Sequence, residues 1–260
     1  TDIAYADDGI KAHMLDIYRP EDSQEKILPV IINVHGGGLI IGNKEFNRYF
    51  CALLCKKGFL VYSIEYRLIP DCLIYDQIAD VFIAMDYIKE RLAADGGDSS
   101  HVYMAGDSGG ACLITYANAI QNNTNIARAA NVTPSGLRIN ALGLISGMFY
   151  TSRFDKIGLF LPKYLYGRDY KKTPFAKYVN PENRELLNSL APVWLVTSHN
   201  DFLRRYTTDF EKALTRAERE HELVVFPKNK KLTHAFSVFE PFLPESSAVI
   251  DMMVEYLRKF

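Results

Sequence analysis

Cysteine is scarce in the 260-residue sequence, long apolar runs are absent, and neither sign of charge is in clear excess. Four cysteines are too few for a disulfide framework in a chain of this length, so we expect free thiols in a reducing, cytoplasmic compartment. No run reaches the roughly 18 consecutive apolar residues of a membrane-spanning helix, and we expect no membrane partner. Because 30 Lys and Arg balance 31 Asp and Glu, no broad attraction to nucleic acid follows either. These absences favour a small, roughly neutral molecule as the partner and leave a homodimer open.

Sequence patterns for bound metals, nucleotides and linkers are missing as well. Cys51 and Cys55 lie four residues apart but lack further Cys or His residues at zinc-site spacing. Neither the dinucleotide-binding pattern GxGxxG nor the P-loop pattern occurs. No internal repeat or Pro/Ser-rich linker divides the chain. We therefore expect no metal, no cofactor and a single domain over residues 1–260.

What the sequence does contain is a regular alternation of short apolar runs with segments of helical periodicity. Such alternation predicts an α/β fold with a mostly parallel central sheet and helices on both faces. We expect strands at 12–18, 28–34, 59–66, 102–105, 139–146, 193–198 and 223–226, and helices at 50–57, 78–92, 109–120, 209–219 and 246–257.

Residues 148–190 interrupt this rhythm, with no clear strand and seven aromatic residues between positions 149 and 170. Long loops in compact domains are usually functional or disordered, and the aromatic content argues against disorder. We interpret the segment as a small helical lid; the alternative is an ordinary surface connection. Its aromatic side chains should fill the pocket, so we expect short acyl groups as ligands and no broad apolar surface for docking on lipid. The substrate-contacting candidates are Phe149, Tyr150, Phe160 and Tyr164.

The strongest local motif is GDSGG at 106–110, between an apolar strand and a helix. In this setting G-x-S-x-G predicts a nucleophile elbow, in which Ser108 occupies a strained turn that neighbouring glycines allow. The same letters surround the nucleophile of trypsin-like proteases. However, Ala111 follows where those proteases carry proline, and the flanking strand–helix alternation does not suit two antiparallel barrels. Ser108 is therefore our candidate nucleophile.

A second glycine-rich motif, HGGG at 35–38, directly follows the apolar run 28–34. Attack on a carbonyl builds negative charge on its oxygen, which backbone N–H groups stabilise when no side chain blocks them. We expect these N–H donors to come from Gly37, Gly38 and Gly109.

A base and an acid should follow Ser108 in the order Asp/Glu, then His. Asp201 comes directly after the run 193–198, at the carboxyl edge of a parallel sheet. His234 follows the last predicted strand. The competitors are Asp209, expected inside a helix and facing solvent, and His221, expected before its strand at the opposite edge. We assign His234 as general base and Asp201 as the acid that orients it.

Taken together, these blocks resemble the bacterial hormone-sensitive-lipase-like esterases. The resemblance rests on HGGGLIIG at 35–42, EYRLIPD at 65–71, GDSGG at 106–110 and the late Asp201 and His234. It implies an α/β-hydrolase fold and a carboxylesterase acting on a small-molecule ester. It also implies that Arg67 helps to fix a loop. Many members carry a helical cap before the first strand, so a compact member and a segment removed before Thr1 both stay open.

Two further functions remain as alternatives to ester hydrolysis. An amidase or small-peptide hydrolase would use the same three residues, because the same acyl-transfer chemistry cleaves amides. A ligand-binding protein without activity is disfavoured, because it has no use for a matched nucleophile, base and acid.

Overall fold

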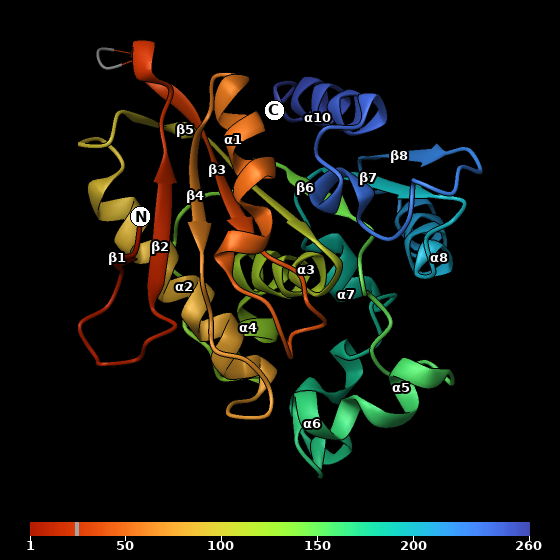
Figure 1. Cartoon of the computed structure of the whole chain (residues 1–260). Coiled ribbons are helices and arrows are strands. Elements are labelled where there is room, and N and C mark those ends of the chain that lie inside the picture. Colours follow the sequence, from red (N-terminus) through yellow and green to blue (C-terminus); the bar gives the residue numbers. More distant parts are fainter. Residues whose placement is uncertain (24–25) are drawn as a thin grey trace.

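A computed structural model describes residues 1–23 and 26–260, in which eight strands form one sheet in the order β1-β2-β4-β3-β5-β6-β7-β8. The strands from β3 onwards run parallel, while β1 and β2 pair antiparallel at one edge (Figure 1). The α/β fold expected from the sequence is confirmed. The strands are β1 (Ile3–Ala4), β2 (Met14–Tyr18), β3 (Leu28–Val34), β4 (Leu60–Ile64), β5 (Gly97–Asp107), β6 (Leu142–Ile145), β7 (Val193–Ser198) and β8 (His221–Phe226).

Helices cover both faces of the sheet because the central strands are apolar on both sides. In β3, the side chains of Val30 and Ile32 pack into one buried cluster and that of Ile31 into the other, as the two-residue period of a strand requires. The first cluster includes residues of α2, α3 and α8, and the second includes residues of α1 and α10. The main helices are α1 (Arg48–Lys56), α2 (Ile74–Arg91), α3 (Ser108–Asn122), α4 (Thr124–Ala130), α8 (Arg204–Arg216), α9 (Phe236–Phe239) and α10 (Pro244–Leu257), with short 3-10 turns η1 (Glu21–Ser23) and η2 (Lys44–Asn47).

The largest differences from the expected boundaries, five residues each, are at the starts of β5 and α8. The strand expected at 102–105 is longer, because β5 already starts at Gly97, which pairs with Leu28 of β3. Helix α8 starts at Arg204, one turn earlier than the expected residue 209. In both places partners far away in the sequence extend the element beyond its local preference.

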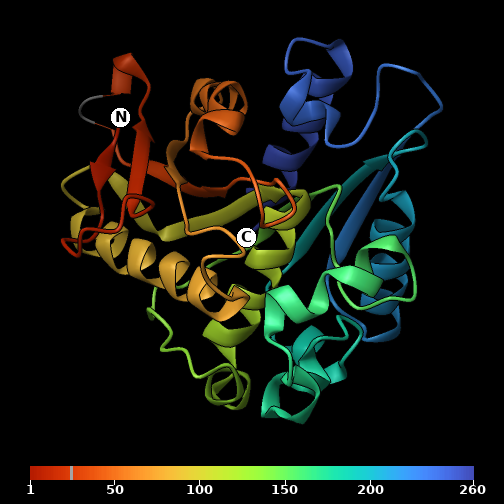
Figure 2. The same ribbon diagram turned by 60° about the horizontal axis from the view of Figure 1, so that its bottom comes forward.

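The connection from β6 to β7 contains five short helical pieces. The first two project beyond the carboxyl ends of the strands (Figure 2), whereas the last packs against α3 as the chain returns to the sheet. They are held to the body by buried aromatic side chains. The hydroxyl of Tyr166 lies 2.7 Å from Thr151 Oγ1 and 2.9 Å from the hydroxyl of Tyr116 on α3. The pieces are α5 (Lys156–Phe160), α6 (Pro162–Tyr166), η3 (Tyr170–Lys172), η4 (Pro174–Tyr178) and α7 (Arg184–Asn188).

Among the described residues, no helix combines the length and the apolar character that crossing a membrane requires.

Candidate active site

Ser108 lies at the sharp turn from β5 into α3, with a positive φ of 50°. A left-handed conformation is uncommon for a residue with a side chain, and it aims the Ser108 hydroxyl out of the turn. The tight packing depends on the glycines. A Cβ atom on Gly110 would lie 2.2 Å from the carbonyl oxygen of Val34, and one on Gly106 would lie 2.6 Å from the same oxygen. Strand β3 therefore approaches the elbow more closely than any side chain permits.

Ser108, His234 and Asp201 form one line of hydrogen bonds. His234 Nε2 lies 2.9 Å from Ser108 Oγ, and His234 Nδ1 lies 2.8 Å from Asp201 Oδ1. Asp201 is itself held in place, because its Oδ1 accepts from the Leu203 N–H at 2.7 Å and its Oδ2 accepts from Thr197 Oγ1 at 3.1 Å. A carboxylate at Nδ1 selects the imidazole tautomer whose Nε2 can accept the serine proton.

The competing residues lie elsewhere. Asp209 forms an ion pair with Arg153 at 2.9 Å on α8. His221 is the first residue of β8, at the amino edge of the sheet, and its Nδ1 lies 2.7 Å from the carbonyl oxygen of Arg219. Among the described residues, neither Asp209 nor His221 forms a hydrogen bond with Ser108 or His234.

The HGGG loop lies against the first turn of α3. A Cβ atom on Gly109 would lie 3.1 Å from the backbone nitrogen of Gly38, so the two segments meet beside Ser108. Gly37 and Gly38 have positive φ values of 104° and 63°. Across the described part of the chain, neither N–H group donates to a protein acceptor, and the N–H of Gly109 belongs to a first helical turn that lacks internal acceptors. These donors can therefore receive a developing oxyanion.

A buried carboxylate ties this loop to the elbow. Asp107 Oδ1 accepts from the N–H of Gly36 at 3.0 Å and from Asn47 Nδ2 at 2.9 Å. Burial raises the pKa of Asp107, and its second oxygen has no partner among the described residues. The sequence motif contained Asp107, but nothing in the sequence indicated this bond or the part played by Asn47.

On the other side of the loop, His35 is held by two neighbours, Tyr66 and Glu65. Its ring stacks on Tyr66 with centroids 4.4 Å apart, and the Tyr66 hydroxyl donates to the His35 carbonyl oxygen at 2.8 Å. His35 Nε2 lies 3.0 Å from Glu65 Oε1. Arg67, which was expected to fix a loop, binds the buried Asp80 through its backbone N–H at 3.0 Å and its Nη2 at 2.6 Å. The EYR run thus supports the strand end from which the HGGG loop departs.

A cavity of about 360 Å³ opens beside Gly38 under α5 and α6, and Phe160 and Tyr164 belong to its wall. Phe149 and Tyr150 do not. The ring of Phe149 stacks on Phe210 at 4.2 Å in the core, and the Tyr150 hydroxyl donates to Glu182 at 2.8 Å. Of the four expected substrate-contacting residues, the structure therefore brings two to the cavity and packs the other two into the body. The wall is formed by Gly38, Ile40, Met148, Lys156, Ile157, Phe160, Leu161 and Tyr164.

The expectation that no broad apolar surface exists does not account for several exposed apolar side chains at this end of the molecule. Large apolar side chains are exposed on several loops that follow the carboxyl ends of β3, β6 and β7, including Phe202, whose ring lies 4.4 Å from that of His234. The sequence did not predict which aromatic side chains of the β6–β7 connection face the core and which face solvent. It also did not predict that these loops lie at the same end of the molecule. We call the following residues the apolar rim: Ile40, Ile41, Phe154, Leu159, Phe160 and Phe202.

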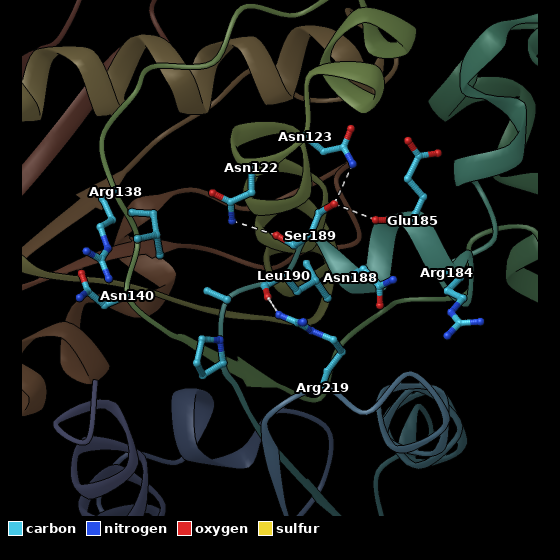
Figure 3. A pocket seen from close by; sticks show the side chains of 13 residues that line it. Asn122, Asn123, Arg138, Asn140, Arg184, Glu185, Asn188, Ser189, Leu190 and Arg219 are labelled. Carbon is cyan, nitrogen blue, oxygen red and sulfur yellow. Dashed lines mark hydrogen bonds between the residues drawn. The ribbon is translucent and has the colours of Figure 1, made fainter.

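A larger cavity, about 840 Å³, lies away from this site (Figure 3). It opens at the amino ends of β6 and β7, where Arg219 donates to the Leu190 carbonyl oxygen at 2.7 Å and Asn122 donates to the Ser189 carbonyl oxygen at 2.9 Å. None of the residues bonded to Ser108 lines it. Its size alone does not make it the reaction site.

The described residues contain no cluster of three or more His, Cys, Asp or Glu side chains placed to hold a metal ion. All four cysteines are free. Burial raises the pKa of the Cys51 and Cys112 thiols to about 12, so both thiols are neutral at physiological pH.

Comparisons with known proteins agree with the fold described above. A family model described as the alpha/beta hydrolase fold matches residues 31–237. A probable isoprenylcysteine alpha-carbonyl methylesterase of Oryza sativa subsp. japonica is 29% identical over 184 residues, covering 66% of this chain and 44% of that protein. The esterase LipC of Mycobacterium tuberculosis is 31% identical over 122 residues, covering 46% of this chain and 30% of that protein. The chain thus spans less than half the length of these curated relatives.

A solved structure of esterase B from Lactobacillus rhamnosis, inhibited by a C4-C4 SN3 tributyrin phosphonate, is similar over nearly the whole chain. The TM-score is 0.92 at 23% sequence identity, and the match covers 99% of this chain and 84% of that one. At this identity the similarity establishes a shared fold.

Proposed function

The chain belongs to the α/β-hydrolase fold family, and from that premise we propose that it is a serine carboxylesterase for short-acyl esters of small molecules. One observation carries the proposal: the hydrogen bonds from Ser108 to His234 at 2.9 Å and from His234 to Asp201 at 2.8 Å, beside unbonded N–H groups. A nucleophile, a base, an orienting acid and oxyanion donors within reach of one another are the parts that acyl transfer requires.

In the proposed reaction, His234 accepts the Ser108 proton while Ser108 Oγ attacks the ester carbonyl carbon. The N–H groups of Gly37, Gly38 and Gly109 stabilise the oxyanion of the tetrahedral intermediate. Protonated His234 then donates its proton to the leaving alkoxide, which departs as the alcohol and leaves the acyl group on Ser108. Water, deprotonated by His234, attacks this acyl-enzyme, and the acid is released. Asp201 stays ionised and stabilises the imidazolium that forms in each half of the cycle.

The acyl preference is supported by the cavity of about 360 Å³ beside Gly38. A cavity of this size rewards only the methylene groups that its wall can cover, at ~0.8 kcal/mol each. The tributyrin phosphonate bound by esterase B carries acyl groups of butyrate length, in agreement with a small acyl pocket in this fold. We extend this to acyl groups of roughly two to six carbons for the present chain.

Within the family we place the chain in the hormone-sensitive-lipase-like branch, on HGGG at 35–38 and GDSGG at 106–110. The matched relatives include plant and bacterial proteins, so the proposal concerns the branch as a whole and not its bacterial members alone. The plant relatives are named as methylesterases, which supports a small alcohol as one leaving group. Four free cysteines support a reducing, cytoplasmic setting as part of the same proposal.

Paired chromogenic substrates test the proposal and its amidase alternative together. We expect p-nitrophenyl butyrate to be hydrolysed with a kcat/KM at least about a hundredfold above that for the matching p-nitroanilide, because the anilide is the poorer leaving group. The Ser108→Ala variant should fold normally and lose several orders of magnitude in turnover. Equal rates on the two substrates would favour the amidase, and activity above about a tenth of wild type in Ser108→Ala would move the nucleophile elsewhere.

A further inference from the structure

We propose that the apolar rim and the cations of residues 148–180 form a surface that docks the protein reversibly on an anionic lipid bilayer. This concerns an interaction surface and is independent of the ester chemistry proposed above, because binding is measured without turnover.

The apolar part of the surface is strongly exposed. Phe154 is 92% exposed, Phe202 74% and Phe160 68%, although large apolar side chains are normally buried. Phe154 and Phe160 lie on the connection from β6 to β7, and Phe202 lies on the loop after β7. Both segments leave the carboxyl ends of strands, and the cavity beside Gly38 is lined by both Ile40 and Phe160. Exposed large apolar side chains that gather at one end of a molecule mark an interaction site. Figures 1 and 2 show α5 and α6 projecting from the sheet at this end of the molecule, where a flat surface can reach them.

The charged part of the surface indicates which kind of partner fits. Residues 148–180 contain seven Lys and Arg but only two Asp, whereas the whole chain has 30 basic and 31 acidic residues. The segment is therefore positive on a molecule that is otherwise negative. Several of its cations are exposed and form no ion pair with a carboxylate among the described residues. They are Lys156, Lys163, Arg168 and Lys171.

Exposed aromatic and aliphatic side chains next to unpaired lysines are suited to the boundary between headgroups and acyl chains. There the apolar groups leave water, and the lysines remain among negatively charged headgroups. A second copy of the chain is a poorer occupant. A two-fold interface would bring the same positive segment of both copies together, and like charges facing one another oppose association.

Vesicle co-sedimentation tests the proposal with the intact chain. We expect binding to phosphatidylcholine vesicles that contain phosphatidylserine, and at least about tenfold weaker binding to phosphatidylcholine alone, because each cation near an anionic surface adds to the attraction. Raising the salt concentration from 0.1 to 0.5 M should release most of the protein, since the screening length then falls well below 10 Å.

Two double variants separate the apolar and the charged parts, and neither touches the cavity wall. Phe154→Ser with Leu159→Ser, and Lys163→Glu with Lys171→Glu, should each weaken binding to the anionic vesicles by about tenfold or more. Both should keep the wild-type rate on a soluble short-acyl ester, which also verifies folding. Ile27→Ser is the matched control: Ile27 is 74% exposed but lies before the amino end of β3, and its loss should not affect binding.

Equal binding to both vesicle types, or unchanged binding by both double variants, would overturn the proposal. So would a dimer in size-exclusion chromatography with light scattering that dissociates in the Phe154→Ser/Leu159→Ser variant, because the rim would then be an interface between copies. A protein that binds anionic vesicles but hydrolyses no ester would leave the docking surface intact and overturn only the proposed function.

Discussion

The sheet with its flanking helices and the connection between β6 and β7 are built in different ways. In the sheet, residues such as Val34 and Leu144 are completely buried, and β6 pairs residue by residue with both β5 and β7. In the connection, no helical piece exceeds five residues, and Phe154 is almost fully exposed. Isolated helices this short are unstable, so their order depends on contacts with the body.

This difference matches what each region has to do. Ser108, His234 and Asp201 must stay within hydrogen-bond distance, and each follows or begins an element of the rigid sheet. The connection only needs to close a cavity and present a surface. Displacements of about an ångström in the side chains of the connection are acceptable for that purpose. The same displacement between Ser108 and His234 would abolish proton transfer. The following predictions test whether this division is as sharp as the structure suggests.

The largest effect is expected from the acid that orients the base. Asp201→Asn should reduce kcat by about 10³ to 10⁴, because the amide no longer selects the productive tautomer of His234. Asp209→Asn is the matched control, since Asp209 pairs with Arg153 on the surface of α8 and should be nearly silent. Steady-state kinetics on p-nitrophenyl butyrate measures both. The reverse order would reassign the acid.

A smaller but still large loss is expected from the oxyanion loop. A Cβ atom on Gly37 would lie 1.8 Å from the carbonyl oxygen of Ile41, so Gly37→Ala must shift the loop and its N–H donors. We expect kcat to fall by about 10² to 10³. Gly136→Ala is the control, because Gly136 also has a positive φ but only the flexible Lys89 side chain nearby. It should cost some stability and no activity; equal kinetic losses would show that backbone strain alone is responsible.

Stability should separate the two regions directly. Leu144→Ala in β6 removes a completely buried side chain and should lower the free energy of unfolding by about 2–5 kcal/mol. Phe154→Ala, at a position that is 92% exposed, should change it by less than about 0.5 kcal/mol. Urea denaturation with an unchanged m-value measures both. A large loss in Phe154→Ala would mean that the connection contributes to the core after all.

The smallest effect concerns acyl length. In a p-nitrophenyl ester series, kcat/KM should peak at roughly C2–C6 and fall steeply by about C10. Phe160→Ala enlarges the cavity wall and should raise the C10-to-C4 ratio about three- to tenfold, since each methylene that becomes accommodated is worth ~0.8 kcal/mol. Phe154→Ala, which does not line the cavity, should leave the ratio unchanged. Equal or higher kcat/KM at C12–C16 in wild type would replace the esterase proposal with a lipase.

The sequence predicted the body far better than the connection, for physical reasons. The limits of β3 at Leu28–Val34 and of β7 at Val193–Ser198 were predicted to the residue, because doubly covered strands are continuous apolar runs bounded by polar or glycine residues. The expected parallel arrangement also placed the loops after the strands at one edge of the sheet, so Asp201 and His234 could be assigned beside Ser108 before any distance was known.

The sequence of the β6–β7 connection has no clear helical or strand periodicity from which buried positions could be predicted. Phe149 and Phe160 look alike in the sequence, but one stacks on Phe210 in the core and the other is exposed at the rim. Only packing against residues distant in the sequence decides between these positions. The bond from Asp107 to the Gly36 N–H was likewise invisible, because it depends on how closely β3 and β5 approach.

The parallel pairing of β6 with β7 also limits how the connection can be redesigned. Leu142 pairs with Val193 in parallel register, so the chain that leaves β6 at Ile145 must travel back along the whole sheet before β7 can begin. A tight turn is too short to join two parallel strands, which need a crossover connection of a dozen or more residues. Shortened variants must therefore keep a return path such as the stretch through α7, and they must also keep the buried Tyr166, which bonds to Thr151 and Tyr116.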